Sequence, residues 1–157
     1  MKTVVIDLSK NLNDLVLSED SFVYGLLVPE KNGIYKNKFN IIIKKSGVTV
    51  KLLIKIVLLG SAEVEFEPNI IIGKTLKDIN CELEIKCLTN TDLSKLKVTP
   101  SMEVSNPNVK VKHSLTISTF NDDQLSYLLS RGLSKIRARK LLIDAFVDDI
   151  IKKIEQE

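Results

Sequence analysis

The residues of this chain best suited to chemistry are one histidine and two cysteines. The single histidine, His113, lies in an extended segment rich in valine and threonine. A neutral imidazole can ligate iron or transfer a proton near pH 7. One histidine cannot complete a metal site, so a second subunit would have to supply the other ligands. A lone histidine in a strand is more often a packed or surface residue.

Cys81 and Cys87 are six residues apart, which places them on the same face of a regular strand. This spacing differs from the C-x-x-C arrangement of chelating cysteines, and free cysteines usually behave as small core hydrophobes. We therefore expect core packing, with a role as transient thiol ligands as the alternative. Two cysteines do not make a disulfide framework, which favours a reduced, cytoplasmic setting.

A nucleotide site and a membrane span are not expected. Gly73-Lys74-Thr75 imitates the end of a phosphate-binding loop, but Pro68 stands where that motif needs a glycine. The longest apolar stretch, residues 51–60, contains Lys55 and is too short to span a bilayer. The short TVVI run after Met1 does not make a signal peptide. At 44% hydrophobic and 27% charged residues, the composition is that of an ordinary soluble globular protein, and a net charge of +3 does not by itself imply a nucleic-acid or membrane partner.

The first two thirds of the chain predict β-structure. Val64 and Phe66 alternate with glutamates, and this period of two puts one face in a core. The predicted strands cover residues 39–45, 48–59, 62–72, 81–88 and 109–117, with weaker candidates at 3–8 and 21–28. Turns are predicted at Ser46-Gly47, Gly60-Ser61, Pro68-Asn69 and Asn106-Pro107-Asn108. A sandwich, a barrel and a β-solenoid are all compatible, although the lack of a clear repeat disfavours a regular solenoid.

The last third predicts a helical hairpin. Asn121 is a good N-cap with Gln124 three residues later, and Gly132 suits a left-handed C-terminal cap. Ser134 caps a second helix. Its predicted apolar stripe consists of Ala138, Leu141, Leu142, Ala145, Phe146, Ile150 and Ile154.

The histidine segment and the hairpin together resemble the C-terminal end of the SufB/SufD family, the non-ATPase components of an iron–sulfur cluster assembly machine. V-K-V-K-H-S-L-T, residues 109–116, stands where SufD-like sequences carry V-K-x-S-H-G-A-T. F-N-D-D-Q-L-S-Y-L-L-S-R-G-L-S, residues 120–134, follows the family pattern I-D-E-E-x-L-F-Y-L-x-S-R-G-I-S without a gap. The SufB pattern V-E-H-E-A-T-T-S-K-I-S-E-D-Q-L-F-Y also aligns without a gap, with its histidine on His113.

The resemblance implies a mainly β protein with a C-terminal helical hairpin. Its core, residues 1–118, would be a short, imperfect right-handed parallel β-helix (β-solenoid), and residues 119–157 would form the two-helix segment. It also implies a scaffold in cluster assembly that is not an enzyme by itself. His113 would lie at the interface of a homodimer or heterodimer of SufB/SufD-like subunits, where a transient iron–sulfur cluster could form.

The resemblance further implies that the hairpin docks a SufC-like ABC ATPase, which would bring the nucleotide chemistry that this chain lacks. The docking candidates are Tyr127, Arg131, Gly132, Arg139 and Phe146.

Three departures from the family pattern affect the chemistry. The SufB glutamate after the histidine is Ser114 here, the SufB cysteine implicated in cluster assembly falls near Ser94, and the SufD cysteine before the histidine is Val111. Full-length family members are also much longer. A structural relative without cluster chemistry is therefore one alternative.

A nucleic-acid-binding protein is the other alternative. The hairpin carries the basic residues Arg131, Lys135, Arg137, Arg139 and Lys140 and imitates the helix-hairpin-helix that grips phosphates. That motif usually needs a second glycine, which is missing here. A solvated basic face is the simpler interpretation. Nucleic-acid binding would fall steeply with salt and on neutralising the basic residues.

Overall fold

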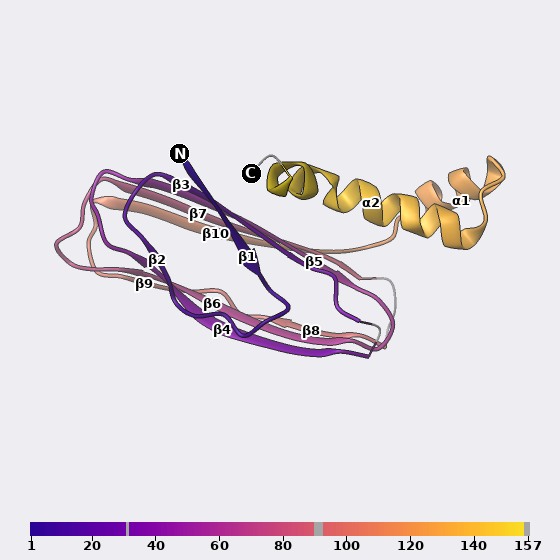
Figure 1. Ribbon diagram of the computed structural model, residues 1–157, viewed down its shortest axis with the longest axis horizontal. Helices are drawn as coiled ribbons and strands as arrows, with labels where there is room; N and C mark the ends of the chain where they lie inside the picture. The colour runs from indigo at the N-terminus through magenta and orange to yellow at the C-terminus, as the bar shows by residue number, and fades with distance from the viewer. Residues whose placement is uncertain (31, 90–92, 156–157) are drawn as a thin grey trace.

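The computed structural model describes residues 1–30, 32–89 and 93–155, which form two parallel β-sheets and a C-terminal helical hairpin (Figure 1). Sheet A has the order β1 (Lys2–Asp7), β3 (Ser21–Leu27), β5 (Thr49–Leu58), β7 (Ile79–Thr89) and β10 (Val109–Thr119). Sheet B contains β2 (Leu15–Leu17), β4 (Ile34–Ile43), β6 (Glu63–Ile72), β8 (Lys95–Val98) and β9 (Ser101–Val104). The chain alternates between the sheets, so successive strands wind a β-solenoid, which confirms the predicted fold class.

The coils repeat at a spacing that the sequence does not reveal. The pairing of sheet A aligns Ser21, Val50, Cys81 and Val111, which are 29, 31 and 30 residues apart. The aligned residues occupy the same position on successive coils but differ in residue type. A solenoid needs only an apolar side chain at each inward position, so the expectation against it from the missing repeat was wrong.

The core is a stack of inward side chains between the two sheets. In β6 the burial alternates strictly, with Val64, Phe66, Ile70 and Ile72 inside. The ring of Phe66 packs against Phe39 of the neighbouring coil, with ring centroids 5.7 Å apart. The predicted alternation in this strand is therefore confirmed.

The predicted turn at Pro68-Asn69 was wrong, because both residues lie inside β6. Proline has no N–H to donate to a sheet. On the neighbouring coil the ladder is interrupted between β8 and β9, at Thr99 and Pro100. The prolines thus divide the neighbouring strand into two short pieces and leave β6 itself continuous.

One end of the solenoid is closed by the chain itself. Residues 8–14 cross from sheet A to sheet B and insert Leu8, which is fully buried. The buried amide of Asn37 fixes this segment: its Nδ2 donates to the Leu8 carbonyl at 2.8 Å, and its Oδ1 accepts from the Leu12 N–H at 3.3 Å. This closure covers the apolar interior at the N-terminal end.

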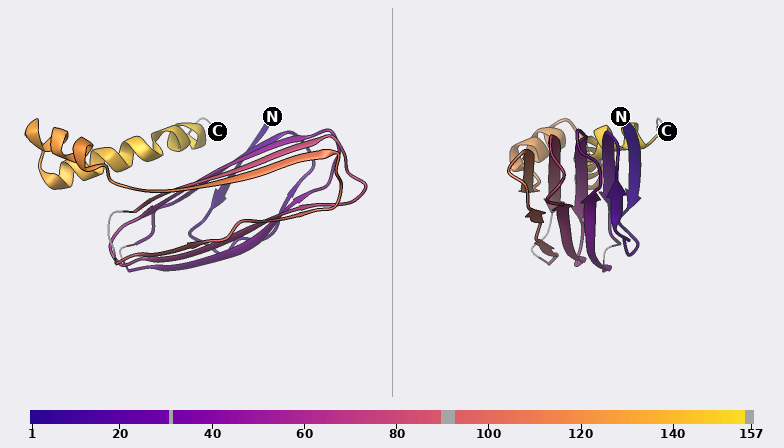
Figure 2. Two further views of the ribbon diagram at one scale, coloured as in Figure 1. Left: turned by 180° about the vertical axis from the view of Figure 1, so that it is seen from behind. Right: turned by 90° about the vertical axis from the view of Figure 1, so that its left-hand side faces the viewer.

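The C-terminal part of the second helix packs on the outer face of sheet A, whereas the other end of the hairpin projects beyond the solenoid (Figures 1 and 2). As predicted, Asn121 caps α1 (Asp122–Ser130), Ser134 caps α2 (Lys135–Ile154), and Gly132 adopts a positive φ of 86°. The predicted apolar stripe of α2 needs correction: Leu141 and Ala145 are exposed, whereas Val147 is buried against the sheet. Among the described residues, neither helix is long and apolar enough to span a membrane.

Candidate functional site

His113 lies on β10, the last strand of sheet A. It pairs with Leu83 of β7, whose side chain is buried in the core. Val111, two residues earlier, packs on that core, and residues two apart share a face of a strand. His113 therefore continues the inward face of the solenoid, yet its side chain is exposed.

The solenoid is open at β10. No strand of the described part of the chain pairs with the outer edge of β10, so its backbone groups are available to a partner. Leu115 and Ile117 sit in register with buried residues of β7 but are 39% and 54% exposed. In sheet B, Met102 and Val104 of β9 are similarly exposed at 41% and 39%. An uncovered apolar surface beside a free strand edge is suited to pairing with another chain.

Cys81 and Cys87 share the inward face of β7, as expected, and both are fully buried. Burial raises the pKa of each thiol to about 12, so both remain protonated near neutral pH. Six residues along a strand separate them by about 20 Å, so they cannot chelate one metal ion together. Their suggested role as thiol ligands stays a prediction and would require the core to open.

No group of three or more metal-ligating side chains occurs in the described residues. The positions aligned with the family's reactive residues carry hydroxyls or valine: Ser114 is exposed, Ser94 contacts the Thr89 hydroxyl at 2.9 Å, and Val111 packs on the core. A metal or cluster site at His113 would therefore need ligands from a partner.

The hairpin presents an apolar groove of about 470 Å³ on its outer side. The groove is lined by Asp123, Gln124, Tyr127 and Leu128 of α1 and by Leu141, Leu142 and Ala145 of α2. Tyr127 is 56% exposed, and the guanidinium of Arg131 lies 5.1 Å from its ring.

Three other docking candidates differ in exposure. Gly132 forms the turn of the hairpin, and a Cβ there would meet nothing within 4 Å. Arg139 is half-buried, and its Nε has no hydrogen-bond partner within the described structure. Phe146 is half-buried against sheet A. Of the five docking candidates, therefore, only Tyr127 lines the open groove, with Arg131 beside its ring.

Lys55 attaches the hairpin to the solenoid, a role that the sequence did not reveal. Its side chain is 6% exposed beneath α2 and donates to the Phe146 carbonyl and the Asp149 carboxylate. Its Nζ also lies 4.8 Å from the ring centroid of Phe146. The only signal in the sequence was a lysine within the apolar run that follows Lys51 in β5. Around it, Val57, Val147 and Ile150 bury the contact between strand and helix.

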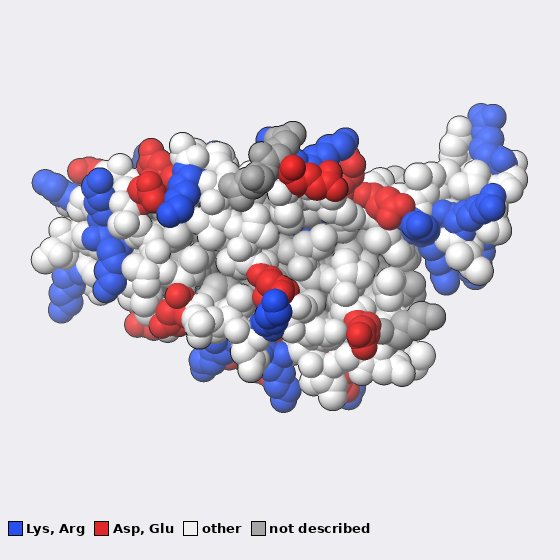
Figure 3. Space-filling view, in the orientation of Figure 1, with Lys and Arg blue, Asp and Glu red and all other residues white. Residues whose placement is uncertain are grey.

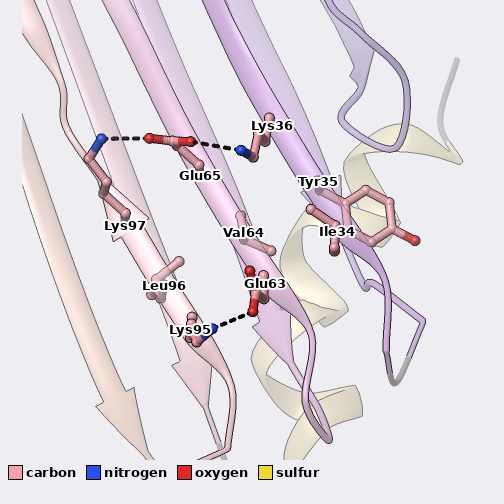
Figure 4. A pocket seen from close by; sticks show the side chains of 9 residues that line it. All are labelled: Ile34, Tyr35, Lys36, Glu63, Val64, Glu65, Lys95, Leu96 and Lys97. Atoms are coloured by element: carbon pink, nitrogen blue, oxygen red, sulfur yellow. Dashed lines mark hydrogen bonds and ion pairs between the residues drawn. The ribbon is translucent and has the colours of Figure 1, made fainter.

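A shallow hollow on the outer face of sheet B offers no comparable site. About 210 Å³ in volume, it lies among side chains that pair across the strands (Figure 4). Glu65 of β6 contacts Lys36 of β4 and Lys97 of β8, and Lys95 contacts Glu63. The hydrogen bond from Lys97 lowers the pKa of the Glu65 carboxyl. Each of these pairs joins neighbouring coils, and among the described residues that line the hollow they leave no charged side chain unpaired.

Basic side chains gather at the free end of the hairpin, where it projects beyond the solenoid (Figure 3). Arg131, Lys135, Arg137 and Lys140 are exposed there. The turn between the helices contains a single glycine, Gly132, as the sequence shows. Nucleic-acid binding at this end stays a hypothesis.

Comparison with known proteins places the chain in a family. The profile described as "SUF system FeS cluster assembly, SufBD core domain" matches residues 15–146. An iron–sulfur cluster assembly SufBD family protein of Synechocystis is 31% identical over 93 residues, covering 59% of this chain and 20% of the relative. A SufBD family protein of Staphylococcus saprophyticus is 28% identical over 85 residues, and the SufB protein of Bacillus subtilis is 26% identical over 85 residues. Each of these two alignments covers 54% of this chain and 18% of the relative.

The chain thus spans about a fifth of the length of these relatives. The matched residues include most of the solenoid, His113 and the first helix of the hairpin. The predicted resemblance is confirmed, and the chain belongs to the SufBD core-domain family of iron–sulfur cluster assembly proteins.

Proposed function

We propose that this protein is a scaffold subunit in iron–sulfur cluster assembly and not an enzyme by itself. In this proposal, β10 pairs with a second SufB/SufD-type subunit, and His113 contributes one ligand or proton carrier to a transient cluster at their junction. The observation that carries the proposal is the open edge of β10, where His113, Leu115 and Ile117 continue the core face without being covered. The partner would cover this apolar surface and supply the missing ligands.

The hairpin would dock a SufC-type ABC ATPase through its apolar groove. The fold allows both contacts at once, because α2 packs on β3 and β5 and leaves β10 at the edge of the sheet. The groove also faces away from the contact between α2 and the sheet, since its lining residues Tyr127 and Leu141 are exposed.

Replacing His113 by alanine is expected to remove the cluster and preserve the complex. Losing a ligand or its proton carrier should lower cluster content about tenfold or more, whereas the exposed side chain contributes little to folding. The measurement is the visible absorption of complexes purified without oxygen after co-expression with the ATPase and a SufB/SufD-type partner. Ser114→Ala, on the opposite face of the same strand, is the matched control. Normal colour in the His113→Ala complex would remove the chemical role and leave only a structural one.

Replacing Leu141 by glutamate is expected to weaken ATPase binding about tenfold to a hundredfold. The substitution places a charge in the apolar groove, and desolvating it costs a few kcal/mol. The fold should remain intact because Leu141 is 48% exposed. Calorimetric titration with the ATPase gives the affinity, and Ile136→Glu, on the same helix but outside the groove, is the control. If only the control lost affinity, the docking surface would lie at the hairpin's end.

A further inference from the structure

The free end of the helical hairpin, residues 131–140, carries several basic side chains and no acidic one; we refer to it as the tip (Figure 3). Arg131, Lys135, Arg137 and Lys140 are exposed there. None of these four side chains has an ion pair within the described structure. The tip is therefore a local patch of positive charge on a chain whose net charge is only +3.

An isoleucine lies among these charges. Ile136 is 82% exposed, more than any other large apolar side chain in the described part of the chain. Residues three and four positions apart are neighbours on a helix, so Ile136 lies beside Arg139 and Lys140. A surface that combines an exposed apolar side chain with basic neighbours suits the boundary between the headgroups and the acyl chains of an anionic membrane.

The isoleucine favours a lipid surface over a nucleic acid as the partner of the tip. Phosphate contacts of a nucleic acid would use the basic side chains and would leave Ile136 without a role. A lipid surface uses both features, because the headgroup phosphates attract the basic side chains while the apolar side chain inserts among the acyl chains.

The fold holds the tip clear of the rest of the molecule. The C-terminal part of α2 packs on sheet A, whereas the tip projects beyond the solenoid (Figures 1 and 2). Ile136 is five positions before Leu141, which lines the apolar groove, and five positions correspond to about 140° around the helix axis. The tip can therefore meet a flat surface while the groove stays accessible to the proposed ATPase.

We infer that the tip attaches this protein reversibly to a membrane surface of anionic phospholipid. Each lysine or arginine near such a surface strengthens binding about fivefold. An isoleucine that inserts among the acyl chains adds about tenfold. The attachment is peripheral and goes beyond the proposed scaffold role, because it needs neither a cluster nor a second subunit.

Flotation of the full-length chain with lipid vesicles tests the inference. Vesicles of equal parts phosphatidylglycerol and phosphatidylcholine should bind the chain at least about tenfold more tightly than vesicles of phosphatidylcholine alone. Ile136→Ser should lower the affinity about tenfold at unchanged charge. The double variant Arg137→Gln with Lys140→Gln should lower it about twenty-fivefold. The matched control is Lys74→Gln with Lys77→Gln, in the exposed turn between β6 and β7 at the opposite end of the solenoid, which should change binding by no more than about twofold.

Each other outcome overturns the inference in a distinguishable way. If the chain binds neither kind of vesicle but binds duplex DNA or RNA of mixed sequence, the basic side chains serve a nucleic acid. If Ile136→Ser binds the anionic vesicles like the wild type, no apolar side chain inserts. If the ATPase displaces the chain from the vesicles, the tip belongs to the protein-docking surface. Vesicle binding is measured without the ATPase or a cluster, so failure of the scaffold proposal would leave this result unchanged.

Discussion

Replacing Ile117 by lysine is expected to leave the solenoid folded and to weaken subunit pairing at least about a hundredfold. Ile117 is 54% exposed, so its loss should change the free energy of unfolding by no more than about 0.5 kcal/mol. In the pair, the new ammonium group would be desolvated in an apolar contact, which costs about 3 kcal/mol or more, and such a cost corresponds to a factor of about a hundred in affinity.

Sedimentation over a range of protein concentrations measures this effect. The matched control is Val16→Lys at the closed end of the solenoid, where Val16 of β2 is 57% exposed. We expect the control to associate like the wild type. Dissociation caused by Val16→Lys and not by Ile117→Lys would show that subunits meet at the other end.

Replacing Lys55 by alanine is expected to loosen the helical hairpin and to cost about 3 kcal/mol of stability. The substitution removes a buried aliphatic stem and leaves a cavity beneath α2. It also leaves the Phe146 carbonyl and Asp149 without their shared donor. Asp149 is 59% exposed and can be hydrated after the substitution. Most of the lost stability should therefore come from the buried part of the contact, beneath α2.

Amide hydrogen exchange along the Lys55→Ala chain shows which elements lose stability. Faster exchange is expected over α2 from Ile143 to Ile154, with the solenoid strands unchanged. Lys51→Ala, on the same strand and face but exposed, should change stability by no more than about 0.5 kcal/mol. Lys55→Met keeps the apolar stem and should retain most of the stability. Uniformly faster exchange throughout the Lys55→Ala chain would mean that the hairpin and solenoid unfold as one unit.

The helical hairpin could be predicted from the sequence because its signals are local. Asn121, Gly132 and Ser134 each act within one helical turn, and the structure finds all three in their expected roles. The face of α2 that packs on the sheet was predicted less well. It depends on Lys55 and Val57, which lie nearly a hundred residues earlier in the chain, and no local pattern reports such a contact.

The long strands could be predicted from the alternation of apolar and polar residues, but the winding of the chain into a solenoid could not. Coils match by the position of apolar residues, as Val50, Cys81 and Val111 show, and not by residue type. The short strands β2, β8 and β9 were missed because three or four residues carry too little periodicity. Pro68 was misread as a turn because its tolerance inside β6 depends on the neighbouring coil.

The candidate site was only partly accessible to sequence reasoning. The lone His113 stood out by its residue type, and its motif led to the family. The open edge around it is a property of the whole solenoid. Leu115 and Ile117 resemble core residues in sequence and are exposed because no further coil of the described residues covers them. Exposure of this kind can be recognised only when the last strand is known.

Anaerobic co-expression with a SufC-type ATPase and a SufB/SufD-type subunit of the host, followed by size-exclusion chromatography, light scattering and visible absorption, tests the scaffold proposal most directly. We predict a complex that contains two SufB/SufD-type chains, whether identical or different, together with the ATPase, and that absorbs in the visible range. A colourless monomer that elutes apart from both proteins would contradict the proposal and leave only the family's fold.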